Sequence, residues 1–498
     1  MTRAETLSGA LGAALRQAIE VYRDEPETAR HLHGHLDRLD EPLRVAIAGK
    51  VKAGKSTLLN ALIGERVAPT DAGECTRVIT WYRDGRGPRI MLHPKAGAPR
   101  QLSVQRDDGA LVIDLGGDPA DEVERLIVDW PSQHLRTATL IDTPGMSSLS
   151  TEVAQRSVMF LNPEDGTPTE ADAVVYLMRH LHATDAQFLE AFRDQDVGRA
   201  VSVNTVGVIS RADEIGGGRV DAMSSAAAVA QRYRTEPALR GLCQNVIAVA
   251  GLLAQTGRTL RQTEFTALAE LSRVPRAQLE SSLLLLDRFL DDDGPLADAV
   301  PTVSAQVRRA LLDRFGVFGI RISTQLIGAG TDTAAALAAE LVRRSGLHEL
   351  QDALHNQFTN RRDVLKARSG LLALDRVLRA DPRPGSEWLS GEVERIVTGA
   401  HEFVELRLLS ALWTGAVILP DPMLREAERL LGGLGAGPAA RLGLPAGTDP
   451  DELRKAALEA LLRWQSQAEN PMSARTTTSA CRVVVRTCEG MVASLTAY

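Results

Sequence analysis

Residues 49–56, Gly-Lys-Val-Lys-Ala-Gly-Lys-Ser, have types and a spacing that suit the binding of a phosphate group. Gly49 and Gly54 allow backbone N–H groups to close around the β-phosphate, and a helix that begins here adds a favourable dipole. Lys55 would neutralise the β- and γ-phosphate oxygens, and the Ser56 hydroxyl would ligate Mg²⁺. The pattern therefore predicts a nucleotide held by its phosphates. The other residues expected around those phosphates are Lys50, Val51, Ala53 and Thr57.

A phosphate loop of this kind joins a strand to a helix, and both flanks of the segment meet that requirement. The apolar run 43–48 before it is typical of a buried strand. Leu58, Leu59 and Leu62 after it begin an apolar helical stripe. The alternative is an ordinary glycine turn, and the two flanks argue against it.

A second group of residues, 142–145, would complete the metal and phosphate site. It follows the strand-like run 138–141. A carboxylate at the end of a strand, here Asp142, can hold Mg²⁺ through water, and Gly145 can offer its N–H to the γ-phosphate. The same Asp-Thr-Pro-Gly sequence would also suit a plain Pro-Gly turn. Its position after a phosphate loop and a strand favours the nucleotide.

Residues 210–213 indicate which base the nucleotide carries. In GTP-binding folds a strand such as 206–209 is followed by Asn or Thr, then Lys, any residue and Asp, and here Ser210, Arg211 and Asp213 take these places. The aspartate accepts hydrogen bonds from the N1–H and the exocyclic amine of guanine, and only guanine offers this pair of donors. An arginine stem can pack on the base as a lysine stem does. Guanine is expected, with a surface salt bridge or relaxed specificity as the alternative.

Two further positions are expected at the nucleotide. Ala250 follows a strand-like run and would contact the base through its backbone. Thr76 lies in the segment 69–77, where a threonine would complete the Mg²⁺ shell and order the loop around the γ-phosphate. Thr70 competes for this role, and the position of Thr76 close before the next strand favours Thr76. The expected metal ligands are Ser56, Thr76 and Asp142.

The pattern along the chain predicts which elements position these residues. Strand-like runs alternate with helical stretches over residues 43–251, which is typical of an α/β sheet, and only helical periodicity follows after about residue 260. One helix is predicted over 347–380, about 50 Å long at 1.5 Å per residue. We expect three parts of the chain: N-terminal helices at 1–40, a nucleotide-binding domain at 41–255, and a helical region at 256–498.

Amphipathic stripes occur near both ends of the chain, in residues 7–22 and 481–495. Each stripe needs an apolar partner in order to be stable in water. Helices from the two chain ends are therefore expected to pack together and to flank the α/β domain.

The composition limits the class of protein. The chain has 498 residues, a formal net charge of −7 and 44% hydrophobic residues, so it is ordinary for a globular protein and gives no support for nucleic-acid binding. No window offers about 18 apolar residues in a row and the start lacks the pattern of a secretory signal, so any membrane contact is expected to be peripheral. Four cysteines fit a reducing cytoplasm: Cys75, Cys243, Cys481 and Cys488.

These residues resemble those of the dynamin superfamily of large GTPases. The resemblance rests on the phosphate loop, on Thr76 with Arg77, and on residues 142–145 and 210–213. It implies an α/β P-loop GTPase domain, with a mixed and mostly parallel sheet, and an elongated all-α helical neck and trunk. Over its length the chain is also similar to the actinobacterial isoniazid-inducible dynamin-like proteins, in the stretches 43–49, 52–58, 210–216 and 259–265.

The resemblance also implies a function and partners. Such proteins hydrolyse GTP to GDP and phosphate with Mg²⁺, pair through their GTPase heads, and remodel or maintain membranes. The expected partners are guanine nucleotide, membrane lipids, and a second copy or a longer dynamin-like relative, with a cytoplasmic location peripheral to the inner face of the membrane. Such a device needs an exposed apolar tip. Residues 315–320 and 412–419 are the candidates, and burial in a core is the alternative for each.

Two positions depart from the dynamin pattern and concern the rate of hydrolysis. Eukaryotic dynamins typically have Gln and Ser where this chain has Val51 and Lys52, and those residues help to position water and a monovalent cation. Val51 cannot orient water, and Lys52 either replaces the cation by a fixed charge or is a solvated lysine. Met146 stands near where small Ras-like GTPases carry a water-orienting Gln.

We therefore expect a slow basal rate of GTP hydrolysis. The residues expected to act in catalysis are Lys52, Lys55 and Thr76. The alternative function is a low-turnover GTP-binding partner that regulates or scaffolds a longer dynamin-like relative.

Overall fold

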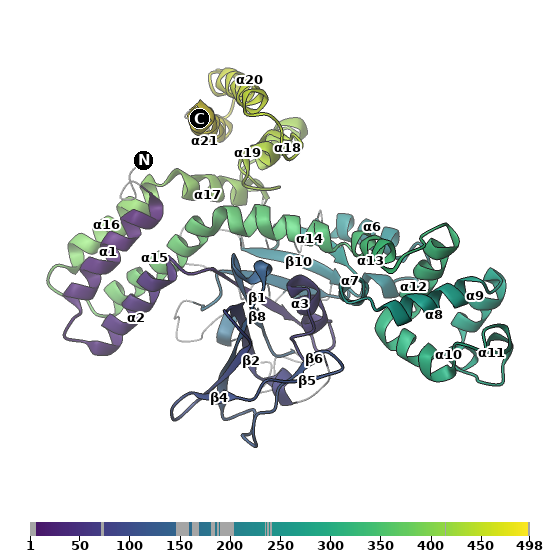
Figure 1. The fold of residues 1–498 in the computed structure, drawn as a ribbon. Helices are drawn as coiled ribbons and strands as arrows, with labels where there is room; N and C mark the ends of the chain where they lie inside the picture. The colour runs from purple at the N-terminus through teal and green to yellow at the C-terminus, as the bar shows by residue number, and fades with distance from the viewer. Residues whose placement is uncertain are drawn as a thin grey trace.

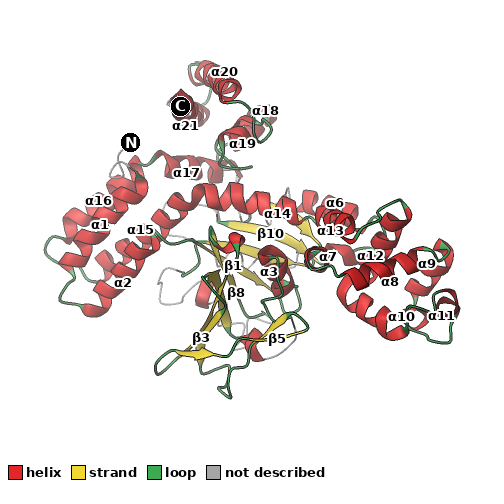
Figure 2. Cartoon of the chain, viewed as in Figure 1, coloured by secondary structure: helices red, strands yellow, loops and turns green. Residues whose placement is uncertain are grey.

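The computed structural model describes residues 6–70, 74–145, 159–161, 169–180, 185, 186, 189, 204–234, 236, 239, 242–413 and 415–496. A central β-sheet separates two groups of helices, one containing the N-terminal helices and the other a lobe of short helices (Figure 1). The last helices of the chain form a third group beside the first. Figure 2 shows helices above and on both sides of the sheet, whereas the part that contains β3 and β5 projects below them.

The sheet has nine strands in the order β11-β10-β9-β1-β8-β2-β7-β3-β4. Pairing is parallel from β11 to β8 and between β2 and β7, whereas β2 is antiparallel to β8 and β3 is antiparallel to both β7 and β4. The predicted mixed, mostly parallel sheet is confirmed. The strands are β1 Leu43–Gly49, β2 Ile79–Asp84, β3 Arg89–Pro94, β4 Arg100–Leu102, β7 Val123–Trp130, β8 Ala138–Asp142, β9 Ala173–Met178, β10 Thr205–Ser210 and β11 Asn245–Val249. A separate hairpin pairs β5 Gln105–Asp107 with β6 Ala110–Val112.

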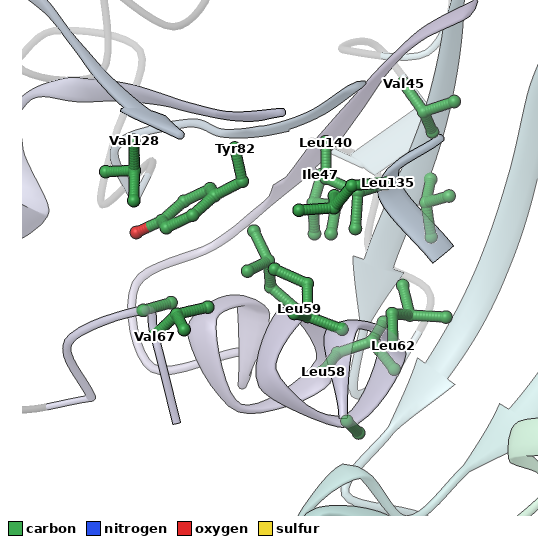
Figure 3. Packing of buried hydrophobic residues seen from close by; sticks show 14 of the residues in the cluster. Val45, Ile47, Leu58, Leu59, Leu62, Val67, Tyr82, Val128, Leu135 and Leu140 are labelled. Atoms are coloured by element: carbon green, nitrogen blue, oxygen red, sulfur yellow. The ribbon is translucent and has the colours of Figure 1, made fainter. Parts of the chain in front are cut away.

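The helix α3 (Lys55–Ile63) packs its apolar side on the sheet directly after the phosphate loop (Figure 3). Leu58, Leu59 and Leu62 share one buried cluster with Ile47 of β1 and Leu140 of β8. Burial of one leucine side chain contributes roughly 1.5–3 kcal/mol. The strand that ends in the loop and the helix that begins from it are therefore fixed against each other. On the other face of the sheet, α6 (Ala222–Arg234) buries Ala226 and Ala230.

The N-terminal helices pack on helices that lie more than 300 residues further along the chain. α1 (Leu7–Val21) and α2 (Pro26–Arg38) lie against α15 (Arg362–Ala380), and α1 also lies against α16 (Ser386–Gly399) (Figure 1). Leu11 and Leu15 of α1 share a buried cluster with Leu371 and Leu374 of α15. We call these four helices the neck.

The C-terminal helix does not pack on the N-terminal one, and the prediction that the two chain ends pair is wrong. The apolar stripe of α21 is buried by α17, α18 and α20 in a separate cluster that includes Cys481, Val484 and Trp464. The chain between the neck and its end forms enough helices to cover this stripe locally. The helices of this group are α17 His401–Trp413, α18 Asp421–Leu430, α19 Pro438–Leu442, α20 Pro450–Ala468 and α21 Arg475–Thr496.

The helices between the sheet and residue 344 form a lobe at the end of the sheet opposite the neck (Figure 1). We call it the lateral lobe. Its longest helix, α12, is kinked at Gly316, where φ is 62°. The helices are α7 Gly251–Arg258, α8 Gln262–Ser272, α9 Arg276–Leu284, α10 Leu286–Phe289, α11 Pro295–Ala299, α12 Ala305–Gly328 and α13 Ala334–Arg344.

The single long helix predicted over 347–380 is interrupted. α14 (Leu347–Ala353) continues into a π-helical turn, Leu354–Phe358, and a 3₁₀ turn, Thr359–Arg361, before α15 begins. Such changes of hydrogen-bond pattern mark strain or a hinge within a helix. The helical periodicity of the sequence could not reveal them, because side chains keep a similar spacing through the interruption.

The two expected apolar tips differ in exposure. Phe315, Phe318 and Ile320 are buried in the core of the lateral lobe, so the alternative of a core segment is correct for 315–320. In the described part of the segment 412–419, Leu412 and Leu419 are buried, whereas Ile418 is 81% exposed. Three consecutive exposed leucines that the sequence did not indicate lie where α9 ends and α10 begins, and these are Leu284, Leu285 and Leu286. No helix among the described residues is long and apolar enough to cross a bilayer.

Candidate nucleotide-binding site

The loop between β1 and α3 has a backbone that only glycine permits at its two ends. Gly49 has φ 148°, and a Cβ atom there would lie 2.5 Å from the carbonyl oxygen of Leu177. Gly54 has φ 91° and is the residue immediately before α3. The first N–H groups of α3 have no partner within the helix and face the loop, so they can bind an anion. The geometry expected of a phosphate loop is present.

The side chain of Lys55 folds back into this loop. Its Nζ donates to the carbonyl oxygens of Gly49 and Lys50, at 3.2 and 3.3 Å. Burial lowers the pKa of the Lys55 ammonium, and the carboxylate of Asp142 opposes that shift. The cation is thus held where a phosphate in the loop would meet it.

Ser56, in the first turn of α3, and Asp142, at the end of β8, lie in contact with each other. The Ser56 hydroxyl donates to Asp142 Oδ2 at 2.8 Å, and Oδ1 is buried without a hydrogen-bond partner among the described residues. Burial raises the pKa of Asp142, while Lys55 and the Ser56 hydroxyl lower it. Oxygen ligands of this kind are those that Mg²⁺ prefers, and an unpartnered buried carboxylate oxygen gains most from a cation. The pair therefore fits a magnesium ion.

Residues 143–145 connect this carboxylate to the loop. The hydroxyl of Thr143 donates to the carbonyl oxygen of Ile47 at 2.9 Å, which fixes the segment to β1. A Cβ atom on Gly145 would lie 2.8 Å from the Cα of Val51 and 3.2 Å from Lys55 Nζ. Only glycine fits so close to the loop. Its N–H is therefore near the position that a terminal phosphate would occupy.

One cavity joins the phosphate loop to the predicted base-reading residues. Its volume is about 170 Å³. Asp213 lines it and is 7% exposed, in the 3₁₀ turn Ala212–Glu214 that follows β10. Burial raises the pKa of this carboxylate to about 6. The other lining residues come from four segments: Ala53, Gly54, Thr57, Leu58, Leu177, Val208, Ser210, Arg211, Glu214, Val249, Gly251 and Leu252.

Ser210, at the end of β10, and Arg211, the next residue, hold the start of the Asp213 turn in place. The Ser210 hydroxyl donates to the carbonyl oxygen of Met178 at 3.3 Å. Arg211 has φ 51°, and its Nη1 donates to Glu214 at 2.8 Å. Arg211 and its partner Glu214 both line the cavity.

Several residues that were predicted to act at the nucleotide do not line the cavity. Lys52 is exposed with φ 61°, and its side chain forms no hydrogen bond or ion pair with any described residue. Val51 is 49% exposed. Thr76 lies in the 3₁₀ turn Glu74–Arg77 before β2 and does not line the cavity. Met146 falls outside the described residues, and Thr70 is exposed at the end of a described segment.

The base end of the cavity differs slightly from the prediction. Ala250 is buried behind the cavity wall, where its N–H donates to the carbonyl oxygen of Ser345 at 2.9 Å. The next two residues, Gly251 and Leu252, line the cavity instead. The strand end indicated this region, but the sequence could not show which residue of the turn faces inward.

Sequence analysis missed a buried carboxylate that holds the phosphate loop from outside. Lys50 Nζ lies 3.1 Å from Asp185 Oδ2, and the Tyr176 hydroxyl donates to Asp185 Oδ1 at 2.8 Å. Asp185 is 1% exposed. The two residues of the ion pair lie 135 positions apart. No local pattern in the sequence could have connected them.

The chain has a phosphate loop at the end of β1, an Asp-Thr-Pro-Gly segment at the end of β8 and a cavity at the end of β10. This combination is typical of a P-loop GTPase. Residues 45–211 match the Dynamin family. Together with a relative that is similar over nearly the whole length, this match shows that the chain belongs to the dynamin family.

That relative is the isoniazid-induced protein IniC of Mycobacterium tuberculosis (strain ATCC 25618 / H37Rv), with 43% identity over 494 residues, covering 97% of this chain and 98% of the relative. The bacterial dynamin-like protein of Nostoc punctiforme is 30% identical over 151 residues, covering 27% of this chain and 20% of the relative. A solved structure described as an oligomerised bacterial dynamin pair for the long-range sensing and tethering of membranes covers 98% of this chain and 74% of its own, with 12% identity and a TM-score of 0.37.

Proposed function

We propose that this protein binds GTP with Mg²⁺ and hydrolyses it to GDP and phosphate. The observation that supports this most strongly is the cavity that connects the phosphate-loop residues Ala53 and Gly54 to the carboxylate of Asp213. A single guanine nucleotide can occupy both ends of such a cavity. Membership of a family of GTPases supports the same conclusion.

We assign roles from the geometry of the described residues. Lys55 and the N–H groups at the start of α3 would hold the phosphates, and Ser56 and Asp142 would hold the magnesium ion, which neutralises phosphate charge. Gly145 would donate its N–H to the γ-phosphate. Asp213 would accept hydrogen bonds from guanine. Thr76 remains a proposed third metal ligand, supported by its place between α3 and β2.

Hydrolysis would depend on the exposed part of the loop. Val51 has no group that can orient water. Lys52 presents a free ammonium beside the loop with no partner among the described residues. We propose that Lys52 supplies a fixed positive charge to the transition state, and that the slow basal rate rises when two heads pair.

We further propose that the protein acts peripherally at the inner face of the membrane, paired with a second copy or with a longer relative. The leucines 284–286 support a membrane contact, since three consecutive exposed leucines are costly in water. A location in the cytoplasm is part of this proposal.

The test is a measurement of GTP binding and turnover, with and without phospholipid vesicles. Lys55→Ala is expected to abolish GDP binding because the phosphates lose their buried cation, whereas Lys95→Ala, at an exposed lysine directly after β3, is the matched control. Wild-type protein that does not prefer GDP to ADP would refute the proposal.

Tight GTP binding without turnover, whether or not vesicles are present, would favour the second candidate function. In that case the protein is a low-turnover partner that regulates or scaffolds a longer dynamin-like relative. The observation that favours it is Val51, an exposed apolar side chain where a water-orienting group is expected.

A further inference from the structure

The segment that follows Asp213 has almost no conformational restraint of its own. Gly216, Gly217 and Gly218 are consecutive and have φ values of 66°, 73° and 68°. Glycine loses more backbone freedom on ordering than any other residue. Ser210 and Arg211 restrain the start of the Asp213 turn, whereas the three glycines at its end need a contact from another element to be fixed.

Arg321 of α12 provides that restraint. Its Nη1 donates to the carbonyl oxygens of Gly218 at 2.7 Å and Gly217 at 3.2 Å. Its Nε donates to Glu280 of α9 at 2.8 Å. Arg321 is only 5% exposed, and the guanidinium joins the glycine segment to two helices of the lateral lobe.

The surroundings make this contact specific to a guanidinium. Gly218 packs against the backbone of α12, since a Cβ atom there would lie 3.5 Å from the Phe318 nitrogen and 3.5 Å from the carbonyl oxygen of Asp213. A planar fork can bond a carboxylate and two carbonyl groups at once, whereas a lysine ammonium on a flexible stem is less well ordered for this. Removal of the guanidinium would leave the buried carbonyl group of Gly218 without this partner, which is costly.

We propose that Arg321 is a positioning residue for guanine recognition: it holds the segment 216–218 so that the Asp213 carboxylate faces the cavity. This inference rests on the proposed function. Arg321 does not touch the nucleotide and acts through the main chain. Because it lies more than 100 residues from the segment that it holds, no pattern in the sequence marks it.

The test of this proposal isolates one hydrogen bond, from the exocyclic amine of guanine to Asp213. Guanine donates to Asp213 through N1–H and the exocyclic amine, whereas hypoxanthine has the N1–H but lacks the amine. A hydrogen bond to a charged group is worth roughly 10- to 100-fold in affinity. The ratio of the affinities for GDP and IDP therefore measures how well Asp213 is placed, independently of the phosphate contacts that both nucleotides share.

The experiment compares this ratio in Arg321→Met, Arg321→Lys and Arg308→Met by titration calorimetry, with thermal unfolding measured without nucleotide. Arg308 is the matched control, since it is a buried arginine of the same helix. It donates to the carbonyl oxygens of Phe289, Val303 and Asp291, at 2.7, 2.6 and 2.8 Å, far from Asp213 in the chain. We expect the wild-type preference for GDP to fall below about threefold in Arg321→Met, to fall partly in Arg321→Lys, and to persist in Arg308→Met.

The outcomes separate the two proposals. Wild-type protein with no preference for GDP over IDP or ADP would overturn both the proposed function and this inference. A wild-type preference that survives in a folded Arg321→Met would overturn the inference alone. If Arg321→Met does not fold, Arg321→Lys decides, because a full wild-type preference in that variant would show that the guanidinium fork is not needed.

Discussion

Asp213 combines two properties that oppose each other. Burial keeps water away from its carboxylate, which strengthens a hydrogen bond to a base, but the same burial raises the pKa to about 6. Guanine donors favour the charged form of the carboxylate. Without a bound base, the Asp213 carboxylate is therefore half protonated at about pH 6.

Replacement of this single carboxylate should change the base that is bound. Asp213→Asn replaces one acceptor oxygen by an amide donor, which suits the C2 carbonyl of xanthine and opposes the exocyclic amine of guanine. We expect the affinity for GDP to fall by at least about tenfold and the affinity for XDP to rise. Titration with GDP, XDP and ADP checks this, and an unchanged order of affinities would mean that Asp213 does not contact the base.

The affinity for GDP should also depend on pH. With a pKa of about 6 in the folded protein, Asp213 is ionised at pH 7 and mostly protonated at pH 5. Only the ionised form accepts both hydrogen bonds, so the affinity should fall about tenfold between pH 7 and pH 5. The binding of GDP to Asp213→Asn, which has no carboxylate to titrate at this position, is the control for protonation of the phosphates. An equal decline in that variant would contradict the assignment.

Lys52 allows a direct test of the proposal that its charge replaces a monovalent cation in catalysis. We expect Lys52→Ser to leave the affinity for GDP within about threefold and to lower kcat by roughly 10²-fold, since the lost charge acts on the transition state. Addition of K⁺ should restore part of the rate, because a serine leaves room for a monovalent cation. Turnover assays in K⁺ and in choline measure this. A kcat equal to that of wild type would make Lys52 a solvated lysine.

At the scale of elements, the sequence alone was sufficient to predict those helices and strands whose contacts are between neighbouring residues. The strand, loop and helix around residues 43–63 follow from an apolar run, two glycines and a leucine stripe that lie next to each other. Asp185 and Arg321 could not be predicted, because each meets its partner only after the chain has folded. Lys366 is a further example. Its Nζ donates to the carbonyl oxygen of Glu41 at 2.6 Å, across 325 residues.

The apolar segments show a different limit of sequence analysis. Residues 315–320 and the leucines 284–286 are equally apolar, and only the packing of α12 into the lateral lobe decides that the first group is buried. The pairing of the chain ends failed for the same reason, since an amphipathic stripe specifies that it needs a partner but not which one.

Two glycines before helices test how the sheet connects to the chain that follows. Gly346 precedes α14 with φ 77°, and a Cβ atom there would lie 2.1 Å from the carbonyl oxygen of Ala248 in β11. Gly385 precedes α16 with φ 89° and has open space around it. Gly385→Ala should cost about 1–2 kcal/mol from backbone conformation alone. Gly346→Ala should cost about 3 kcal/mol or more, since the strand must move.

Thermal and denaturant unfolding of both variants would measure this difference. Equal losses of stability would show that α14 can shift away from β11 at little cost. The same comparison without and with GDP shows whether the disturbed strand reaches the base pocket, which includes Val249 of β11.

For the whole molecule, the lateral lobe and the neck lie at opposite ends of the sheet (Figure 1). The three exposed leucines 284–286 lie in the lateral lobe, where α9 ends and α10 begins. If this surface contacts lipid, the membrane and the neck lie on opposite sides of the nucleotide site. The exposed leucines of α20, Leu458 and Leu462, form a second apolar surface for comparison.

Replacement of all three leucines 284–286 by Asp should reduce sedimentation with anionic phospholipid vesicles by more than tenfold. Transfer of three partly exposed leucines into lipid is worth about 3 kcal/mol in total. The control replaces Leu458 and Leu462 by Asp. Equal binding of both variants would place the membrane contact elsewhere, and loss in the control alone would assign it to α20.

The neck has a consequence for how the protein is made. The Tyr22 hydroxyl donates to the carbonyl oxygen of Asp381 at 2.6 Å, across 359 residues. At a synthesis rate of about 5–20 residues per second, α1 leaves the ribosome about 20–70 s before the helix that covers it. During that time Leu11 and Leu15 have no core to enter, while the complete sheet can already fold. The unfinished chain therefore exposes apolar surface on its first helix, and a molecule that stops before α15 leaves uncovered the side of α1 that packs on α15 and α16.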